Sequence, residues 1–75
     1  MSAVRKRSVS IRGHRTSFSV EAEFFRELES IAAARKVSLA ALVGEIDAAR
    51  PRDANLSSAL RVFVLSEVMR RAGAG

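Results

Sequence analysis

The stretch "RGHRTSFSVEAEFF", residues 12–25, decides the fold because its periodicity changes in the middle. As far as Ser19, apolar and polar residues alternate, which is typical of a β-strand with one buried face. From Glu21 onward the apolar residues recur every three or four positions, which is typical of an amphipathic helix. The sequence therefore predicts a basic strand that runs into a helix with almost no loop between them.

The basic segment before this helix contains two sets of alternating apolar residues. The odd-numbered set is Val9 and Ile11, and the even-numbered set is Thr16, Phe18 and Val20. A single regular strand would turn its apolar face over at such a change of parity. A type II′ turn at Gly13-His14 would resolve the change by pairing a strand over residues 7–12 with a strand over residues 15–20. This turn places Ile11 opposite Thr16. A bulge at Gly13 is the alternative.

Three helices are predicted after the strand, over residues 21–36, 38–49 and 55–71. Their apolar stripes contain Phe24, Phe25, Leu28, Ile31 and Ala32 in the first helix, Leu39, Leu42, Val43 and Ile46 in the second, and Leu56, Leu60, Phe63, Val64 and Met69 in the third. Ser38 and Asn55 are favourable N-cap residues for the second and third helices. Because the third helix is apolar on more than one face, we expect it to be largely buried, in part by a partner chain.

A chain of 75 residues forms at most one domain, which buries only a modest part of its surface. We expect this domain to span residues 7–72, with a flexible basic arm over residues 1–6 and a frayed tail over residues 73–75. The chain has no cysteine and one histidine, which excludes disulfides and thiolate zinc sites and makes a metal site unexpected. Oligomerisation is then the remaining common way to stabilise so small a domain.

The net charge of +5 lies entirely in the first twenty residues. Five basic residues precede the first acidic residue, Glu21, and the rest of the chain contains eight basic and eight acidic residues. This distribution favours a polyanionic partner such as double-stranded DNA. We recognise neither a signal peptide nor an apolar run of the ~20 residues that a membrane span needs. We therefore expect a soluble protein of the cytoplasm, associated with the nucleoid and not with a membrane.

No arrangement of residues points to catalysis. His14 has no carboxylate or nucleophile at a catalytic spacing, and the four glycines do not form a phosphate-binding loop. We therefore expect the protein not to be an enzyme and to require no cofactor.

The outward face of the predicted strand carries Arg15, Ser17 and Ser19. A two-stranded ribbon fits the major groove of DNA, where arginine and serine can contact base edges. Since an unpaired strand is not stable alone, we expect it to pair with the same strand of a second chain. The amides at the start of the helix headed by Ser38 suit a phosphate group. Further phosphate contacts are expected from Arg5, Lys6, Arg7, Arg12 and His14.

The stretch "RTSFSVEAEFFRELESIAAARKVSLAALVGEI", residues 15–46, resembles the ribbon-helix-helix family of bacterial and phage DNA-binding proteins. The flanking strings "KRSVSIRGHRTSFSVE" and "NLSSALRVFVL" resemble a small subfamily with an extra C-terminal helical segment, so the resemblance spans residues 6–65. It implies a mainly α fold with a short N-terminal β-ribbon and a third helix, assembled as an intertwined homodimer. It also implies base contacts from Arg15, Ser17 and Ser19, and phosphate contacts from Ser38 and the amide of Leu39.

In function, the resemblance implies a transcriptional regulator, usually a repressor, and some members are antitoxins. The segment at residues 55–71 departs from the minimal two-helix fold and offers a surface for a second protein. The alternative is a protein-interaction or dimerisation module, such as an antitoxin or a subunit adaptor, with little sequence-specific DNA binding. Because serine occupies two of the three strand positions, sequence specificity would rest on Arg15 and on DNA shape.

Overall fold

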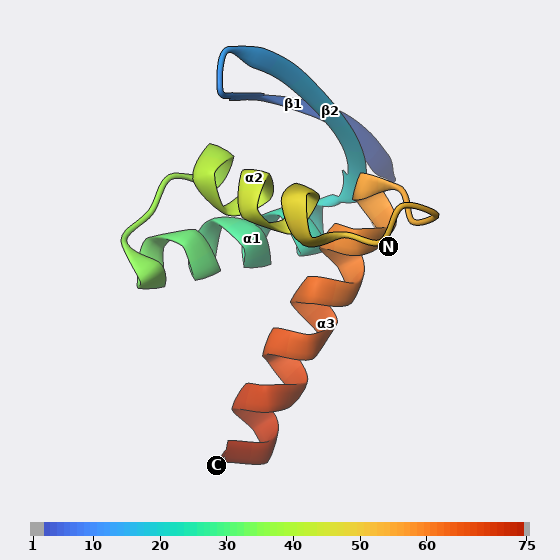
Figure 1. Ribbon diagram of the computed structural model, residues 1–75. Helices are drawn as coiled ribbons and strands as arrows, with labels where there is room; N and C mark the ends of the chain where they lie inside the picture. The colour runs from blue at the N-terminus through green and yellow to red at the C-terminus, as the bar shows by residue number, and fades with distance from the viewer. Residues whose placement is uncertain (1–2, 75) are drawn as a thin grey trace.

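The computed structural model describes residues 3–74 and contains a β-hairpin followed by three helices (Figure 1). The elements are β1 (Val4–Ile11), β2 (His14–Glu21), α1 (Ala22–Arg35), α2 (Leu39–Ala49) and α3 (Leu56–Ala74). The hairpin forms a layer over α1 and α2, whereas α3 projects away from the hairpin towards the C-terminus (Figure 1). The predicted mainly α fold with an N-terminal β-ribbon and a third helix is confirmed.

The hairpin resolves the change of parity without a bulge, but its turn lies one residue earlier than predicted. Arg12 and Gly13 occupy the turn with φ angles of 51° and 81°, so both have the left-handed conformation that a type I′ turn requires. The strands pair antiparallel over eight residue pairs, from Ile11–His14 to Val4–Glu21. Ile11 therefore does not face Thr16, and the predicted register is wrong by two residues.

Charge explains this difference in register. The predicted turn would have set Arg12 opposite Arg15, and like charges directly opposite each other destabilise a pair of strands. In the observed register Arg15 lies opposite Ser10 instead. Because the shift is an even number of residues, the apolar residues of both strands remain on the same face.

Both ends of the described chain are more regular than predicted. β1 begins at Val4, so Arg5 and Lys6 belong to a paired strand and not to a flexible arm. At the other end α3 continues to Ala74, beyond the residue 73 at which fraying was expected. Residues 1, 2 and 75, which belonged to the same two predicted segments, lie outside the described residues.

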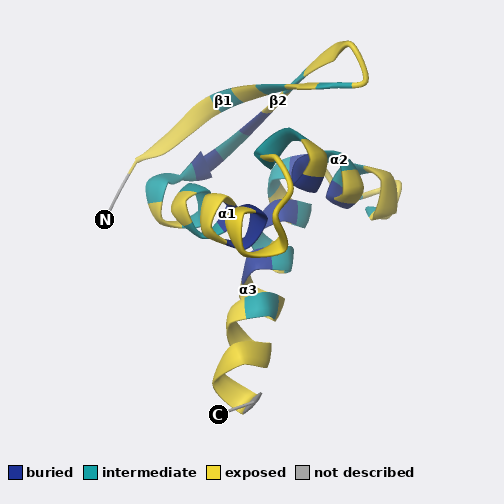
Figure 2. Ribbon diagram, turned by 90° about the vertical axis from the view of Figure 1, so that its left-hand side faces the viewer, coloured by how far each residue is buried: buried dark blue, intermediate teal, exposed yellow. Residues whose placement is uncertain are grey.

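One core joins the inward face of the hairpin to all three helices. Its buried residues are Phe18 and Val20 from β2, Leu28, Ile31 and Ala32 from α1, Leu42, Val43 and Ile46 from α2, and Leu56, Leu60 and Val64 from α3. They gather where the hairpin, α1, α2 and the start of α3 meet (Figure 2). The alternation along β2 therefore places its even-numbered residues inward, as the sequence predicts.

α3 is buried over its first half only, contrary to the prediction of a largely buried helix. Leu56, Leu60 and Val64 enter the core, but no residue described after Val64 is buried. The later turns are exposed except at Glu67, which is partly buried (Figure 2). Neither α3 nor any other helix within residues 3–74 is long and apolar enough to cross a membrane.

Ion pairs hold the second half of α3 to α1. The Glu67 carboxylate accepts hydrogen bonds from Arg70 at 3.1 Å and from Arg35 of α1 at 3.2 Å, and Arg71 pairs with Glu27 at 2.6 Å. The bond from Arg70, aided by that from Arg35, lowers the pKa of Glu67. The two pairs of Glu67 therefore stabilise the fold above the ordinary pKa of a glutamate, and this contribution is lost as the pH falls through the lowered pKa of Glu67.

We predict that Gly13→Ala lowers the free energy of unfolding by about 1 kcal/mol, because a side chain disfavours the left-handed conformation. No atom lies within 4 Å of the added Cβ, so the effect isolates the backbone conformation. Gly73→Ala in α3 is the matched control, since its Cβ also meets no atom within 4 Å and a helix tolerates alanine better than glycine. Urea denaturation measures both variants. Equal stability of the two would contradict the assignment of the turn.

Candidate nucleic-acid interface

The outward face of the hairpin is a strip of four serines and two basic side chains. It contains Lys6, Ser8 and Ser10 of β1 and Arg15, Ser17 and Ser19 of β2. The structure thus brings the three predicted base-contact residues onto one face of β2, opposite to the face whose residues Phe18 and Val20 are buried in the core. The sequence analysis did not single out Ser8 and Ser10, although the parity of the first strand places them on this face.

The two strands align this strip so that each basic side chain lies opposite a serine. Lys6 lies opposite Ser19, and Arg15 lies opposite Ser10. Between them the hydroxyls of Ser8 and Ser17 are 3.2 Å apart and hydrogen-bond to each other. The centre of the strip therefore holds only short serine side chains, and one long basic side chain, Lys6 or Arg15, lies near each end. This shape allows the backbone of the ribbon to approach a partner closely.

α3 fixes the base of the ribbon through the backbone of Ser19. The Ser19 amide donates to the Ser57 hydroxyl at 2.8 Å, and Arg61 donates to the Ser19 carbonyl at 3.1 Å. Arg61 also pairs with Glu21, at the end of β2, at 3.1 Å. Sequence reasoning missed these contacts, which join residues about forty positions apart and leave no local signal.

The structure separates Arg7 from the other predicted phosphate contacts. Arg7 lies opposite Phe18 on the inward side of β1, and its guanidinium carbon is 3.8 Å from the ring centroid of Phe25. Its Nε atom is buried without a hydrogen-bond partner. Arg5 has the same parity but is exposed near the end of the strand. Arg7 therefore serves the packing of the hairpin on α1, and the outward strip does not include it.

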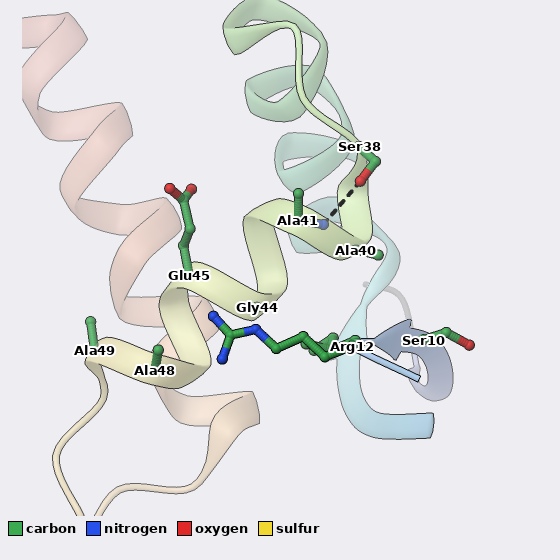
Figure 3. A pocket seen from close by; sticks show the side chains of 10 residues that line it. Ser10, Arg12, Ser38, Ala40, Ala41, Gly44, Glu45, Ala48 and Ala49 are labelled. Carbon is green, nitrogen blue, oxygen red and sulfur yellow. Dashed lines mark hydrogen bonds between the residues drawn. The ribbon is translucent and has the colours of Figure 1, made fainter. Parts of the chain in front are cut away.

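A groove between the hairpin tip and α2 is lined by both Arg12 and Ser38, with Ser38 at the N-terminus of the helix and the Arg12 guanidinium farther along it (Figure 3). Arg12 extends from the turn across α2, near the backbone of Gly44 (Figure 3). A Cβ on Gly44 would lie 3.2 Å from the side chain of Ile11, so glycine permits the close approach of the tip to the helix. His14 is exposed at the same end of the hairpin, directly opposite Ile11.

Ser38 is the N-cap of α2, as predicted. Its hydroxyl accepts a hydrogen bond from the Ala41 amide at 3.0 Å. The amides of the first helical residues, Leu39 and Ala40, have no acceptor within the helix because no preceding turn exists. They point out of the N-terminus, where the helix dipole favours an anion.

The charges of the helices are largely paired among themselves. Arginines of the helices and their connections form ion pairs with Glu21, Glu27, Asp47 and Glu67. The basic excess therefore belongs to the hairpin, where Arg5, Lys6, Arg12 and Arg15 are exposed. A polyanion would meet its strongest attraction on this side of the molecule.

The sequence model of one protein family, described as a ribbon-helix-helix domain, matches residues 4–68 of the chain. The match includes the hairpin, α1, α2 and most of α3. Comparison with curated proteins and with solved structures finds no significant match.

We predict that Ser38→Ala lowers the free energy of unfolding by about 1 kcal/mol, because the Ala41 amide loses its acceptor. Ser38→Asp restores the acceptor and should retain stability close to that of the wild type. Thermal and urea denaturation followed by circular dichroism measure both variants. A loss of stability in Ser38→Asp equal to that in Ser38→Ala would show that the hydroxyl does not act as a cap.

Proposed function

Since the chain belongs to the ribbon-helix-helix domain family, whose members are DNA-binding regulators, we propose that it is a homodimeric repressor of transcription. It would insert its β-ribbon into the major groove of double-stranded DNA. The observation that carries this proposal is the outward strip of the hairpin, which combines short polar side chains with exposed cations. As a bacterial regulator it would act in the cytoplasm, on the nucleoid.

The ribbon supports this role within a single chain. A two-stranded antiparallel ribbon has the width that the major groove admits. β2 finds its partner in β1, so a second chain is not needed to complete the ribbon. Pairing between the strands of two chains, expected from the sequence, is therefore not a requirement for a ribbon to enter the groove.

The residues on the outward strip would have different roles in DNA binding, because their side chains differ in length and in the number of hydrogen bonds they can donate. Arg15 can donate two hydrogen bonds to a guanine edge and so provides most of the direct base recognition. Ser17 and Ser19 make shorter and less selective contacts, and the Ser19 backbone is already held by α3. Specificity would therefore depend on Arg15 and on the energy of deforming the DNA.

Phosphate contacts would fix the register of the ribbon on the duplex. Ser38 and the Leu39 amide offer an anion site at the N-terminus of α2, and Arg12 reaches into the same groove. Arg5, Lys6 and His14 are exposed along the hairpin and can reach the DNA backbone. Arg7 would act indirectly, because it holds the hairpin against Phe25.

We predict that binding to duplex DNA weakens steeply with salt. If a dimer makes about six phosphate contacts, the logarithm of the association constant falls with the logarithm of salt concentration at a slope of about −5. Fluorescence anisotropy of a labelled duplex at four or more salt concentrations gives this slope. Duplex binding that is absent or insensitive to salt refutes the proposed function.

We predict that Arg15→Ala weakens binding to a selected site by roughly 10-fold to 100-fold, because one bidentate base contact is lost. Binding to random duplexes should weaken far less. Selection from a random duplex library supplies the preferred site. Arg26→Ala, which removes the same charge from an exposed position of α1, is the matched control and should leave the preference unchanged. An equal loss of affinity for both kinds of DNA in Arg15→Ala would remove Arg15 from base recognition.

A further inference from the structure

The two strands of the hairpin carry the same short pattern of residue types. β1 contains "KRSVSI" at residues 6–11, and β2 contains "RTSFSV" at residues 15–20. In both segments a basic residue stands first, serines stand third and fifth, and apolar residues stand fourth and sixth. The residues of the two strands therefore correspond at a constant offset of nine positions.

The register of the hairpin converts this repeat into a local two-fold symmetry of its outward strip. Ser8 lies directly opposite Ser17, and their hydroxyls are 3.2 Å apart and hydrogen-bond to each other. Because the strands are antiparallel, a two-fold axis at this central pair exchanges the strands. It exchanges each remaining outward residue with its counterpart in the other strand, Lys6 with Arg15 and Ser10 with Ser19. A single chain therefore presents equivalent side chains in the same order along both strands.

Packing against the helices does not explain the repeat on the outward face. The inward counterparts are unequal, because Phe18 and Val20 are buried in the core whereas Val9 and Ile11 are only partly buried. No residue of the outward strip is buried. A symmetric pattern on a face that the core does not use is expected where the partner has two-fold symmetry itself.

Duplex DNA has this symmetry, because its two antiparallel strands are related by two-fold axes perpendicular to the duplex. A protein with two-fold symmetry therefore recognises a palindromic site. Lysine and arginine both donate hydrogen bonds to the O6 and N7 atoms of guanine in the major groove. Lys6 and Arg15, which the symmetry of the strip exchanges, are thus suited to equivalent guanines on the two DNA strands.

The spacing of the two basic residues corresponds to a short stretch of DNA. Lys6 lies opposite Ser19, which is four residues from Arg15 along β2. At about 3.4 Å per residue, the two basic side chains start roughly 14 Å apart along the ribbon. Successive base pairs are separated by about 3.4 Å, so this distance corresponds to about four base-pair steps.

We propose that β1 is a second base-reading strand, so that the hairpin of one chain recognises a short inverted repeat in DNA. Arg15 contacts a guanine on one DNA strand, and Lys6 contacts a guanine on the other, about four base pairs away. The hydrogen-bonded pair of Ser8 and Ser17 lies over the centre of the repeat. This base contact replaces the backbone contact that charge alone indicates for Lys6. The inference rests on the proposed function, because it requires the ribbon to enter the major groove.

The two halves of the strip differ in their basic residue, and the difference has a consequence for specificity. Arginine binds both acceptors of guanine through a planar fork, whereas lysine presents one ammonium group on a flexible chain. We therefore expect a weaker preference for guanine at the position that Lys6 reads than at the position that Arg15 reads. Lys6→Arg should make the two preferences equal.

Selection from a random duplex library, followed by sequencing, tests the inverted repeat. We expect the wild type to select guanines on opposite DNA strands, about four base pairs apart. Lys6→Ala should lose the preference for one guanine of this pair and bind the wild-type site about 10-fold more weakly, whereas Arg15→Ala should lose the preference for the other. Lys6→Arg should retain both preferences and strengthen the weaker one.

Arg5→Ala is the matched control, because it removes the neighbouring positive charge from the same strand. Arg5 is exposed like Lys6, but it lies opposite Val20 and its parity keeps it off the outward strip. Arg5→Ala should weaken binding to selected and random duplexes alike and leave both guanines in the selected site. Circular dichroism confirms that each variant is folded.

The outcome of the selection separates this inference from the proposed function. The inference is overturned if the wild type selects no such pair of guanines, or if Lys6→Ala keeps both of them. It is also overturned if Arg15→Ala loses both guanines, since two copies of Arg15 from two chains would then read the pair. These three results leave duplex binding intact, whereas a wild type that binds no duplex refutes the proposed function as well.

Discussion

The arrangement of the ribbon depends on one contact, that of the Ser19 backbone with the first turns of α3. A two-stranded hairpin is at best marginally stable in water, and its outer edge leaves backbone groups without partners. Ser57 and Arg61 satisfy both groups of Ser19, each of which would cost about 1–3 kcal/mol if buried and unpaired. Arg61 also binds Glu21, so a single side chain fixes β2, the start of α1 and α3 relative to one another. The third helix, which the minimal strand-helix-helix pattern lacks, is thus what positions the candidate DNA-contacting face.

The elements that could be predicted from the sequence are those in which apolar residues recur at a regular spacing within a short stretch of chain. Alternation over Thr16, Phe18 and Val20 fixed the inward face of β2, and the helical stripes located three helices. The position of the turn was not predictable from parity, because turns at residues 12–13 and 13–14 keep the same residues on the same face. The like charges of Arg12 and Arg15 decide between them. Each candidate turn fixes its own register, so this comparison was possible from the sequence, but the sequence analysis did not make it.

The contacts of Ser57 and Arg61 with Ser19 could not be predicted from the sequence, for a different reason. Ser57 and Arg61 are ordinary helix residues in the sequence, and only the fold brings them to Ser19. Arg7 illustrates the converse case, in which the structure gives a side chain a contact that its charge did not indicate. Its odd position, shared with Val9 and Ile11, places it on the inward face of the hairpin, but the sequence analysis counted it by charge and grouped it with the phosphate contacts. For Arg7, the position on the strand decides which residues the side chain contacts, and its charge does not.

The separation of a basic ribbon from a balanced α3 has a consequence for how dimerisation and DNA binding influence each other. In the proposed homodimer, two chains of charge +5 repel each other in the absence of DNA, and salt screens that repulsion. DNA would neutralise the same charges, so a duplex that binds both ribbons of the proposed homodimer would also stabilise the pair of chains. Salt therefore acts in opposite directions on the two equilibria: it favours association of the free protein and opposes association with DNA. Since coupling between binding events is reciprocal, the surface that joins the two chains of the proposed homodimer would contribute to DNA affinity even where it makes no contact with DNA.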